Sequence, residues 1–290
     1  MSDPFDLNDD TAYARWREAK LAQAPTDLAE LIVEIADPRT LSEAEHQAIL
    51  SCCRRANMAI YVGRTGDDPD KAIPIALGAR LGLQGLDHNR GADDDAITAL
   101  TVQSDARHRD YIPYSNRPIA WHTDGYYNAP EHQIHALLLH CVRPAEDGGA
   151  NALLDHEIAY LMLRDRDPAH IAALMHPDCM TIPAHVVEGV ELRPERTGPV
   201  FAVRPDGRLH MRYTHRSRNI LWCDDPATRA AVAALKAVIE TPSPWHFEGR
   251  LESGWGLISN NVLHTRTAFT DGEAPRLLYR ARYDERIAGT

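Results

Sequence analysis

Two side chains that could hold a metal ion lie in one short stretch, residues 118–125. His122 and Asp124 are two residues apart, and the strand-forming residues Ile119 and Trp121 come before them. In an extended chain, residues i and i+2 point to the same face. An imidazole and a carboxylate therefore project together from the end of a predicted strand, which supplies half of a metal site.

The third ligand of such a site must come from elsewhere in the chain. Two neutral imidazoles and one carboxylate on one face of an iron ion leave coordination positions open, as Fe(II) oxygenases require. The best candidate for the second imidazole is His264, near the end of a predicted strand over 256–264, with an arginine-rich strand over 276–283 soon after. Spacing alone leaves open the ordinary alternative, in which each histidine is only a packed or exposed side chain.

Other groups with ligand chemistry are weaker candidates. His132, His135 and His140 lie in or beside the apolar run 133–142, which predicts a central strand. Core or surface histidines explain them better than metal ligands do. The acidic residues 93–95 fit a solvated loop better than a cation site.

The helices that accompany the strands have clear signals. Ser42 is a good N-cap and Glu45 lies three residues later, so this capping box predicts a helix over about 43–55. An amphipathic pattern predicts a second helix over 227–240. Residues 1–40 are expected to form a partly helical N-terminal extension.

The distribution of the strands indicates the architecture. Within the N-terminal extension, residues 12–22 and 28–35 are the expected helical pieces. The predicted strands that carry the candidate site residues occur in both halves of the chain. They show no regular β-α-β alternation. We therefore expect one mainly β domain over residues 1–290, an antiparallel barrel or sandwich flanked by helices.

Composition excludes several classes of partner. The formal net charge of −11 argues against general binding to nucleic acid or to an anionic membrane, although a locally basic pocket remains compatible with it. No apolar run has the length of a membrane span, and residues 1–10 do not resemble a signal peptide. The five cysteines include no Cys-x-x-Cys pair, which favours free thiols in a reducing compartment. We expect a cytoplasmic protein with a small-molecule substrate, as a monomer or a homo-oligomer.

Four blocks of sequence carry a family resemblance. They are, in order, Trp121–Gly125, Gly148–Asn151, Asn261–Phe269 and Pro275–Arg280. The chain resembles the TauD/TfdA-like family, the taurine-dioxygenase and γ-butyrobetaine-hydroxylase-like branch of the Fe(II)/2-oxoglutarate-dependent dioxygenases. The resemblance implies a double-stranded β-helix (jelly-roll) core that uses Fe(II), 2-oxoglutarate as co-substrate, and O2.

The resemblance also implies roles for individual residues. His122, Asp124 and His264 match the family's iron ligands. Arg276 matches the arginine that pairs with the distal carboxylate of 2-oxoglutarate, and a planar guanidinium can hold a carboxylate through two parallel bonds. Arg280, four residues later, resembles a second family arginine near the co-substrate or the substrate.

One position departs from the family pattern. The family usually has Gly-Gly-x-Thr, and the threonine hydroxyl contacts the same carboxylate. Asn151 occupies that position here, and its amide can also donate a hydrogen bond. The implied reaction is the hydroxylation of a small polar molecule (an amine, sulfonate, phosphonate or carboxylate) with release of succinate and CO2.

The substrate is open at this level. Aromatic residues would suit a cationic amine through cation–π attraction, whereas arginines would suit a sulfonate, phosphonate or carboxylate. The polar segment 104–117 is either the rim of the site or a surface excursion. The candidate substrate residues are Tyr111, Tyr114, Asn116, Tyr126, Tyr127, His210, Arg212 and Tyr213, for each of which ordinary packing or surface charge is the alternative.

Two other classes of function use the same residues. A zinc hydrolase would need a general base beside the metal-bound water, and no His-Glu-x-x-His motif supplies one. A jelly-roll protein that only binds its ligand would not need Arg276. Both observations favour the oxygenase.

Overall fold

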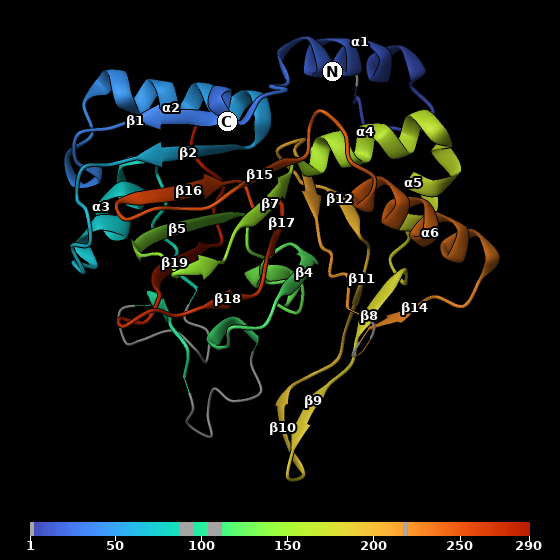
Figure 1. Ribbon diagram of the computed structural model, residues 1–290. Coiled ribbons are helices and arrows are strands. Elements are labelled where there is room, and N and C mark those ends of the chain that lie inside the picture. The colour runs from blue at the N-terminus through green and yellow to red at the C-terminus, as the bar shows by residue number, and fades with distance from the viewer. Residues whose placement is uncertain (1–2, 88–95, 104–111, 217, 219) are drawn as a thin grey trace.

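Two β-sheets form the centre of the molecule in the computed structural model, which describes residues 3–87, 96–103, 112–216, 218 and 220–290 (Figure 1). Their strands pair antiparallel, apart from β1 with β2. The larger sheet has the order β1 (Ile32–Glu34), β2 (Met58–Val62), β16 (Trp255–Ser259), β5 (Ala136–Arg143), β19 (Leu277–Tyr283) and β3 (Thr98–Leu100). The smaller sheet has the order β15 (Phe247–Gly249), β7 (Asn151–Leu154), β17 (Leu263–Arg266) and β4 (Ile119–His122).

Strand β5 is apolar throughout because both of its faces are covered. Leu137 and Leu139 belong to a buried cluster that also contains Leu153 of the smaller sheet, so they fill the space between the sheets. Leu138 belongs to a different cluster, with Leu50 of α2 (Glu43–Ala56) and with residues of α3 (Ala72–Arg80). A strand buried on both faces shows a continuous apolar run rather than alternation.

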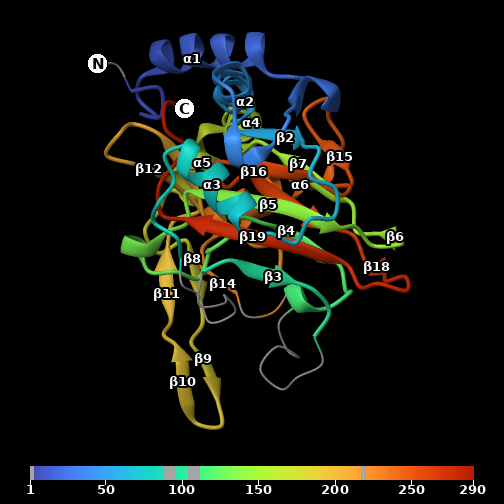
Figure 2. The same ribbon diagram turned by 90° about the vertical axis from the view of Figure 1, so that its left-hand side faces the viewer.

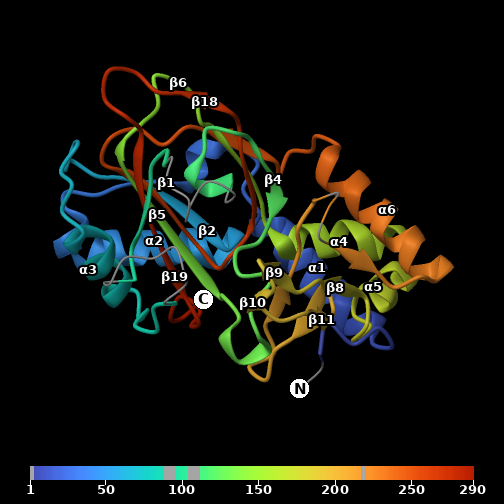
Figure 3. The same ribbon diagram turned by 90° about the horizontal axis from the view of Figure 1, so that it is seen from below.

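A second group of helices lies on the other flank of the sheets, as the view from below shows (Figure 3). It consists of α4 (His156–Arg166), α5 (Pro168–Leu174) and α6 (Pro226–Glu240), and α1 (Asp10–Gln23) packs beside α4. Their apolar residues share a third buried cluster with Phe201 and Met211. The fold is therefore mainly β with helices on both flanks, as predicted.

The remaining strands are short. The hairpin β9 (His185–Val187) and β10 (Val190–Arg193) projects away from both sheets and from the helices in two perpendicular views (Figures 1 and 2). The others are β6 (Asp147–Gly148), β8 (Met180–Ile182), β11 (Arg196–Gly198), β12 (Phe201–Val203), β13 (Leu209–Met211), β14 (Leu221–Trp222) and β18 (Phe269–Thr270).

The predicted helix starts agree with the structure. Glu45 N–H donates to Ser42 Oγ over 3.3 Å, and Ser42 N–H donates to Glu45 Oε2 over 2.7 Å, so the capping box that begins α2 is complete. Helix α2 ends at Ala56, one residue beyond the predicted end. The amphipathic helix predicted over 227–240 is α6, which starts one residue earlier because Pro226 occupies its first turn, where proline is tolerated.

The N-terminal prediction is wrong in one part. Residues 28–35 are not one helix: a single 3-10 turn over Leu28–Leu31 is followed by strand β1. Ile32 pairs with Ile60 in parallel register, and Val33 is buried against the helices of the larger sheet. Residues up to Glu34 thus belong to the central sheet, because the β-branched pair gains more burial in a strand than in a helical turn.

The cysteines are free thiols among the described residues. Four are buried and Cys223 is half-buried. None of the helices in the described part of the chain is long and apolar enough to cross a membrane. The acidic stretch 93–95 lies outside the described residues, so its prediction is not addressed.

Candidate metal centre

His122 and His264 face each other across two neighbouring strands. His122 ends β4, and it is the antiparallel register partner of His264 in β17. The centroids of the two imidazole rings are 4.2 Å apart. Strand pairing thus brings together two side chains that are remote in sequence.

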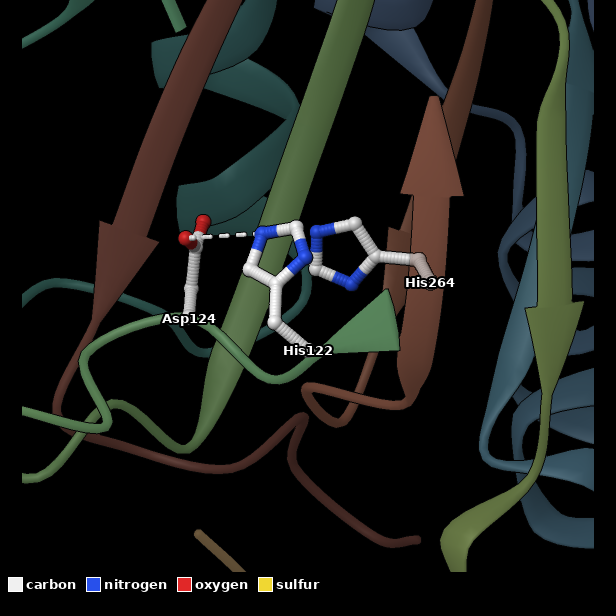
Figure 4. A group of neighbouring side chains, drawn as sticks. All are labelled: His122, Asp124 and His264. Atoms are coloured by element: carbon white, nitrogen blue, oxygen red, sulfur yellow. Dashed lines mark ion pairs between the residues drawn. The ribbon is translucent and has the colours of Figure 1, made fainter. Parts of the chain in front are cut away.

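Asp124 completes the group from the turn after β4. Its side chain and that of His122 point toward each other beside the ring of His264 (Figure 4). Asp124 Oδ1 is 3.8 Å from His122 Nε2, and one ligand atom from each of the three residues lies within 4.8 Å of the others. Within the described residues, this is the one group of three such side chains that the structure brings together. We call it the metal cluster.

Main-chain carbonyls orient both imidazoles. His122 Nδ1 is 2.9 Å from the carbonyl oxygen of Ala120, and His264 Nδ1 is 2.9 Å from that of Val262. A carbonyl only accepts, so each Nδ1 carries the proton and each Nε2 keeps its lone pair. This is the arrangement in which a histidine binds a metal ion through Nε2.

Burial and charge keep these groups in their ligand forms. Burial lowers the pKa of His122 to about 3, and the charges of His264 and Arg216 act in the same direction. Burial also lowers the pKa of His264. Burial alone would raise the pKa of the Asp124 carboxyl, but the charges of Arg280 and Arg282 outweigh it and hold that pKa below its ordinary value.

The donor set fits a divalent cation. Asp124 Oδ2 is buried and has no hydrogen-bond partner among the described residues. Its carboxylate and the two neutral imidazoles each place one ligand atom within 4.8 Å of the others, so three acceptors converge, and the Arg280 guanidinium, 3.6 Å from Oδ1, lies beyond hydrogen-bond distance. Buried acceptors without donors are costly unless a cation fills the space. Two imidazoles and one carboxylate suit Fe(II).

Asn261 fixes the backbone of Asp124. Its Oδ1 accepts from Asp124 N–H over 2.7 Å, and its Nδ2 donates to the carbonyls of Asp124 over 2.9 Å and of Ile134 over 2.8 Å. The sequence interpretation gave Asn261 no role. The backbone of Asn261 has φ +54°, a left-handed conformation that asparagine tolerates better than most residues. No sequence pattern predicts this conformation.

Arg276, Asn151 and Gly149 lie around one narrow pocket that has no space for a water molecule in this conformation. The Arg276 guanidinium is buried and stacks over Phe269, with 4.9 Å from its carbon to the ring centroid. Asn151 Nδ2 donates to the Thr265 carbonyl over 2.6 Å, which leaves its second N–H available.

A double-glycine turn shapes this region. Gly148 has φ +74°, and a Cβ there would lie 2.1 Å from the carbonyl oxygen of Ala268. Only glycine permits both that conformation and that approach. The turn thereby brings Gly149 close to Arg276, where a Cβ at Gly149 would be 3.6 Å from Nε.

Three of the candidate substrate residues are engaged elsewhere. The Arg212 guanidinium donates to four main-chain carbonyls, including that of Tyr126 at 2.7 Å. Tyr213 is fully buried, and its hydroxyl is 3.0 Å from His215 Nδ1. His210 is buried against the ring of His135, with a centroid distance of 4.6 Å.

The remaining candidates have other surroundings. Tyr126 and Tyr127 follow Asp124 after one intervening glycine, and their rings form an edge-to-face pair with centroids 5.1 Å apart. Tyr114 is buried, whereas Asn116 is exposed and accepts the Phe269 N–H at its main-chain carbonyl. Tyr111 lies outside the described residues.

The other histidines and the loop before β4 are also placed. His140 is buried with its Nδ1 2.8 Å from the Tyr61 hydroxyl, and His132 is exposed.

Arg266 of β17 holds residues 112–117 in place, because its guanidinium donates to the carbonyls of Ser115 and Arg117 over 2.6 Å. The described part of the loop therefore rests against a strand of the metal cluster.

Comparison with known proteins agrees with this geometry. The sequence model of the family described as "Taurine catabolism dioxygenase TauD, TfdA family" matches residues 27–282, which is most of the chain. The chain belongs to this family. It is therefore an Fe(II)- and 2-oxoglutarate-dependent dioxygenase.

Relatives within the family include two curated enzymes. The chain is 31% identical over 277 residues to a uridine-5'-phosphate dioxygenase of Amycolatopsis sp., which covers 89% of this chain and 98% of that protein. It is 30% identical over 200 residues to a uridine-5'-phosphate dioxygenase of Streptomyces sp., which covers 66% of this chain and 70% of that protein.

Solved structures of TauD/TfdA-like fold resemble the model at lower identity. One is an asparagine oxygenase in complex with Fe(II), hydroxyasparagine and succinate, with a TM-score of 0.58 and 16% identity over 84% of this chain and 80% of that one. Another is the non-heme iron oxygenase OrfP with Fe and α-ketoglutaric acid, with a TM-score of 0.59 and 18% identity over 84% and 80%. At these identities the likeness concerns the fold.

Proposed function

We propose that this dioxygenase hydroxylates a phosphorylated nucleoside, with uridine 5'-phosphate as the first substrate to test. The observation that carries the oxygenase activity is the convergence of two imidazole nitrogens and one carboxylate oxygen within 4.8 Å of one another. The substrate class rests on the similarity to the Amycolatopsis enzyme, which extends over 98% of that protein's length.

The proposed fold is a single domain over residues 1–290 with a double-stranded β-helix core. Two mainly antiparallel sheets that share one buried cluster support it. The cross-strand pair His122–His264 places the proposed site on the smaller sheet, and Arg280 of the larger sheet reaches Asp124 from the other side, with Nη1 3.6 Å from Oδ1. Both sheets would thus contribute to one centre.

In this proposal His122, Asp124 and His264 hold the iron. When bound, Fe(II) supplies the redox chemistry by which O2 and 2-oxoglutarate oxidise a C–H bond of the substrate, with release of succinate and CO2. The surrounding carbonyls hold the protons of both imidazoles on Nδ1, and Arg280 offsets part of the buried charge of Asp124.

Arg276 would hold the distal carboxylate of 2-oxoglutarate. Among the described residues no acidic side chain lies within ion-pair distance of its guanidinium, which is buried in the narrow pocket that Asn151 also lines. A buried arginine without an acidic partner is well placed to take a carboxylate in two parallel bonds. The second N–H of Asn151 could add the contact that threonine makes in relatives.

The charges around the two tyrosines favour an anionic substrate over a cationic amine. The guanidinium carbon of Arg216 is 5.9 Å from the centre of the Tyr126 ring, and those of Arg193 and Arg282 are 5.4 and 5.8 Å from that of Tyr127. Cations already occupy positions over these rings, so a quaternary amine would be repelled rather than attracted. A phosphate would meet complementary charge.

The test is substrate-dependent turnover of 2-oxoglutarate. Purified protein with Fe(II) and 2-oxoglutarate is mixed with uridine 5'-phosphate, uridine, taurine or a quaternary amine, and succinate and the oxidised product are measured. We expect uridine 5'-phosphate to give the highest rate of product formation, and we expect no product without O2. Faster oxidation of taurine or of the amine would overturn the proposed substrate class.

A further inference from the structure

A short segment after β13 is bonded to the metal-bearing strand. Thr123 N–H donates to the Tyr213 carbonyl over 3.0 Å, and His215 N–H donates to the Trp121 carbonyl over 2.8 Å. Thr214 is the bridge partner of His122. The residue that follows this ladder is therefore held next to the metal cluster by main-chain bonds on both sides of His122.

That residue is Arg216, and its guanidinium lies beside the site. Its carbon is 5.9 Å from the centre of the Tyr126 ring, and its charge acts on both His122 and Tyr126. The side chain is exposed. An exposed cation thus lies beside Tyr126 and close enough to His122 for its charge to act on that imidazole.

Other arginines near the cluster already have partners. Arg282 donates to Tyr127 Oη and pairs with Asp87. Arg280 lies 3.6 Å from the Asp124 carboxylate, and Arg212 is committed to main-chain carbonyls. Arg193 donates to the Pro183 carbonyl. These guanidinium groups are part of the scaffold that holds the site.

Arg216 differs from them in this respect. No hydrogen bond or ion pair joins its guanidinium to any residue that the structure describes. Its backbone follows a main-chain ladder, its guanidinium carbon lies 5.9 Å from the centre of the Tyr126 ring, and it belongs to a chain with a net charge of −11. In so acidic a protein, an unpaired cation beside the metal cluster gives a local attraction for an anion that the rest of the surface opposes.

We propose that Arg216 receives the phosphate group of the substrate and so makes the enzyme select phosphorylated over unphosphorylated nucleosides. This inference rests on the proposed function. The planar guanidinium offers two parallel N–H donors that match two phosphate oxygens. No acidic partner must be displaced when the phosphate enters.

The role predicts a change in discrimination. The phosphate contact is present both in the bound substrate and in the transition state, so its loss raises KM more than it lowers kcat. The ratio of kcat/KM for uridine 5'-phosphate to kcat/KM for uridine should fall roughly 10- to 100-fold in R216A, the range for a charge-assisted hydrogen bond. R216K keeps the charge without the planar fork and should lose less.

The experiment compares wild type, R216A, R216K and R218A with Fe(II) and 2-oxoglutarate. Arg218 is an exposed arginine two residues away, so R218A removes the same charge from the same segment. We expect R218A to keep the wild-type ratio. Binding of uridine 5'-phosphate without O2, measured by isothermal titration calorimetry, gives a second readout and should weaken most in R216A, less in R216K, and not in R218A.

The outcomes are separable. If wild type neither binds nor oxidises uridine 5'-phosphate, both the proposed substrate and this inference fail. If wild type oxidises it and R216A keeps the wild-type ratio, the proposed function stands and the assignment of Arg216 is wrong. An equal fall in R218A shows a general charge effect and also overturns the assignment. A parallel loss of kcat/KM for both substrates in R216A indicates a structural defect rather than a lost phosphate contact. This outcome would also overturn the assignment of Arg216.

Discussion

Two buried groups of charged side chains in this molecule are satisfied in opposite ways. In the first, which we call the lysine cluster, Lys20 Nζ lies 2.6 Å from both Asp155 Oδ2 and Glu157 Oε2. Asn57 donates to the other oxygen of Asp155 over 2.9 Å. In the metal cluster, by contrast, the Arg280 guanidinium stays 3.6 Å from Asp124 Oδ1, beyond hydrogen-bond distance, and Asp124 Oδ2 has no hydrogen-bond donor among the described residues.

The difference separates structure from function. The lysine cluster closes on itself and joins α1 to the start of α4, so its charges serve the fold. The two carboxylates hold the pKa of Lys20 above its ordinary value although burial opposes them. In the metal cluster three acceptors converge and the charges of Arg280 and Arg282 offset the carboxylate from a distance, so a bound cation would stabilise the arrangement further.

The largest expected effect is the loss of metal binding in the metal cluster. His264→Ala removes one of three ligands, so we expect no retained Fe(II) after desalting and no formation of succinate. Without metal, the free energy of unfolding of His264→Ala should fall less than it does when the cation of a buried ion pair is removed. The reason is that the substitution takes away one of the three converging acceptors. Metal analysis and urea denaturation measure the two quantities.

His132→Ala is the control for this change, because His132 is exposed and outside the cluster. It should retain the metal and the turnover of wild type. Full metal binding by His264→Ala would show that the three residues are not the ligand set.

The lysine cluster should show the opposite result. Lys20→Met leaves two buried carboxylates without their cation, which should lower the free energy of unfolding by about 3–5 kcal/mol. The affinity of the remaining folded protein for Fe(II) should be unchanged. Urea denaturation gives the first quantity and metal titration the second.

Arg17→Ala provides a matched control on the same helix. Arg17 pairs with Asp165 over 2.7 Å, but its side chain is 41% exposed. Water screens such pairs, so the expected loss is below about 1 kcal/mol. A loss for Lys20→Met as small as that for Arg17→Ala would contradict the structural role of the lysine cluster.

Two neighbouring asparagines divide between the clusters. Asn260 Nδ2 donates to Asn57 and to Thr290, on the side of the lysine cluster, whereas Asn261 binds the backbone of Asp124. Asn261→Ala should therefore weaken Fe(II) binding about 10- to 100-fold, the usual effect of losing a residue that orients a ligand. Asn260→Ala should destabilise the fold and leave the affinity for Fe(II) unchanged.

Both affinities are measured by metal titration of protein shown to be folded by circular dichroism. Equal weakening in the two variants would mean that Asn261 acts through general stability and not through Asp124. Recovery of affinity in Asn261→Asp, which keeps an oxygen for the Asp124 N–H, would sharpen the assignment.

The candidate ligands of the metal cluster can be predicted from the sequence, whereas the residue that orients Asp124 cannot. The spacing of His122 and Asp124 at the end of a strand is a local property, and so is the capping box of Ser42 and Glu45; the structure contains both, with His122 ending β4 and Asp124 in the turn that follows. The contact between Asn261 and Asp124 joins residues 137 apart, and only the pairing of β17 with β4 creates it.

The same limit explains the substrate residues. The sequence makes Arg212 a candidate substrate residue because it lies in a polar segment. Its guanidinium instead donates to main-chain carbonyls of strands β8 and β11, and no local sequence signal predicts those contacts. Arg216, four residues later, belongs to the same polar segment and remains available. Tertiary hydrogen bonding, and not residue type, separates the two.

The smallest expected effect concerns a histidine outside both clusters. Burial lowers the pKa of His135 to about 4 from an ordinary value of 6.5, and its ring packs against His210. Below pH 6.5 the unfolded chain therefore binds a proton that the folded protein does not, so stability falls as the pH decreases from 6.5 toward 4. Between pH 6.5 and 5.5 this group should contribute a loss of about 1 kcal/mol.

The experiment measures the free energy of unfolding of wild type and His135→Asn at the two pH values, with both proteins saturated with Zn(II). Metal holds the imidazoles of the metal cluster unprotonated in both proteins, so an identical pH dependence in the variant would place the acid sensitivity elsewhere.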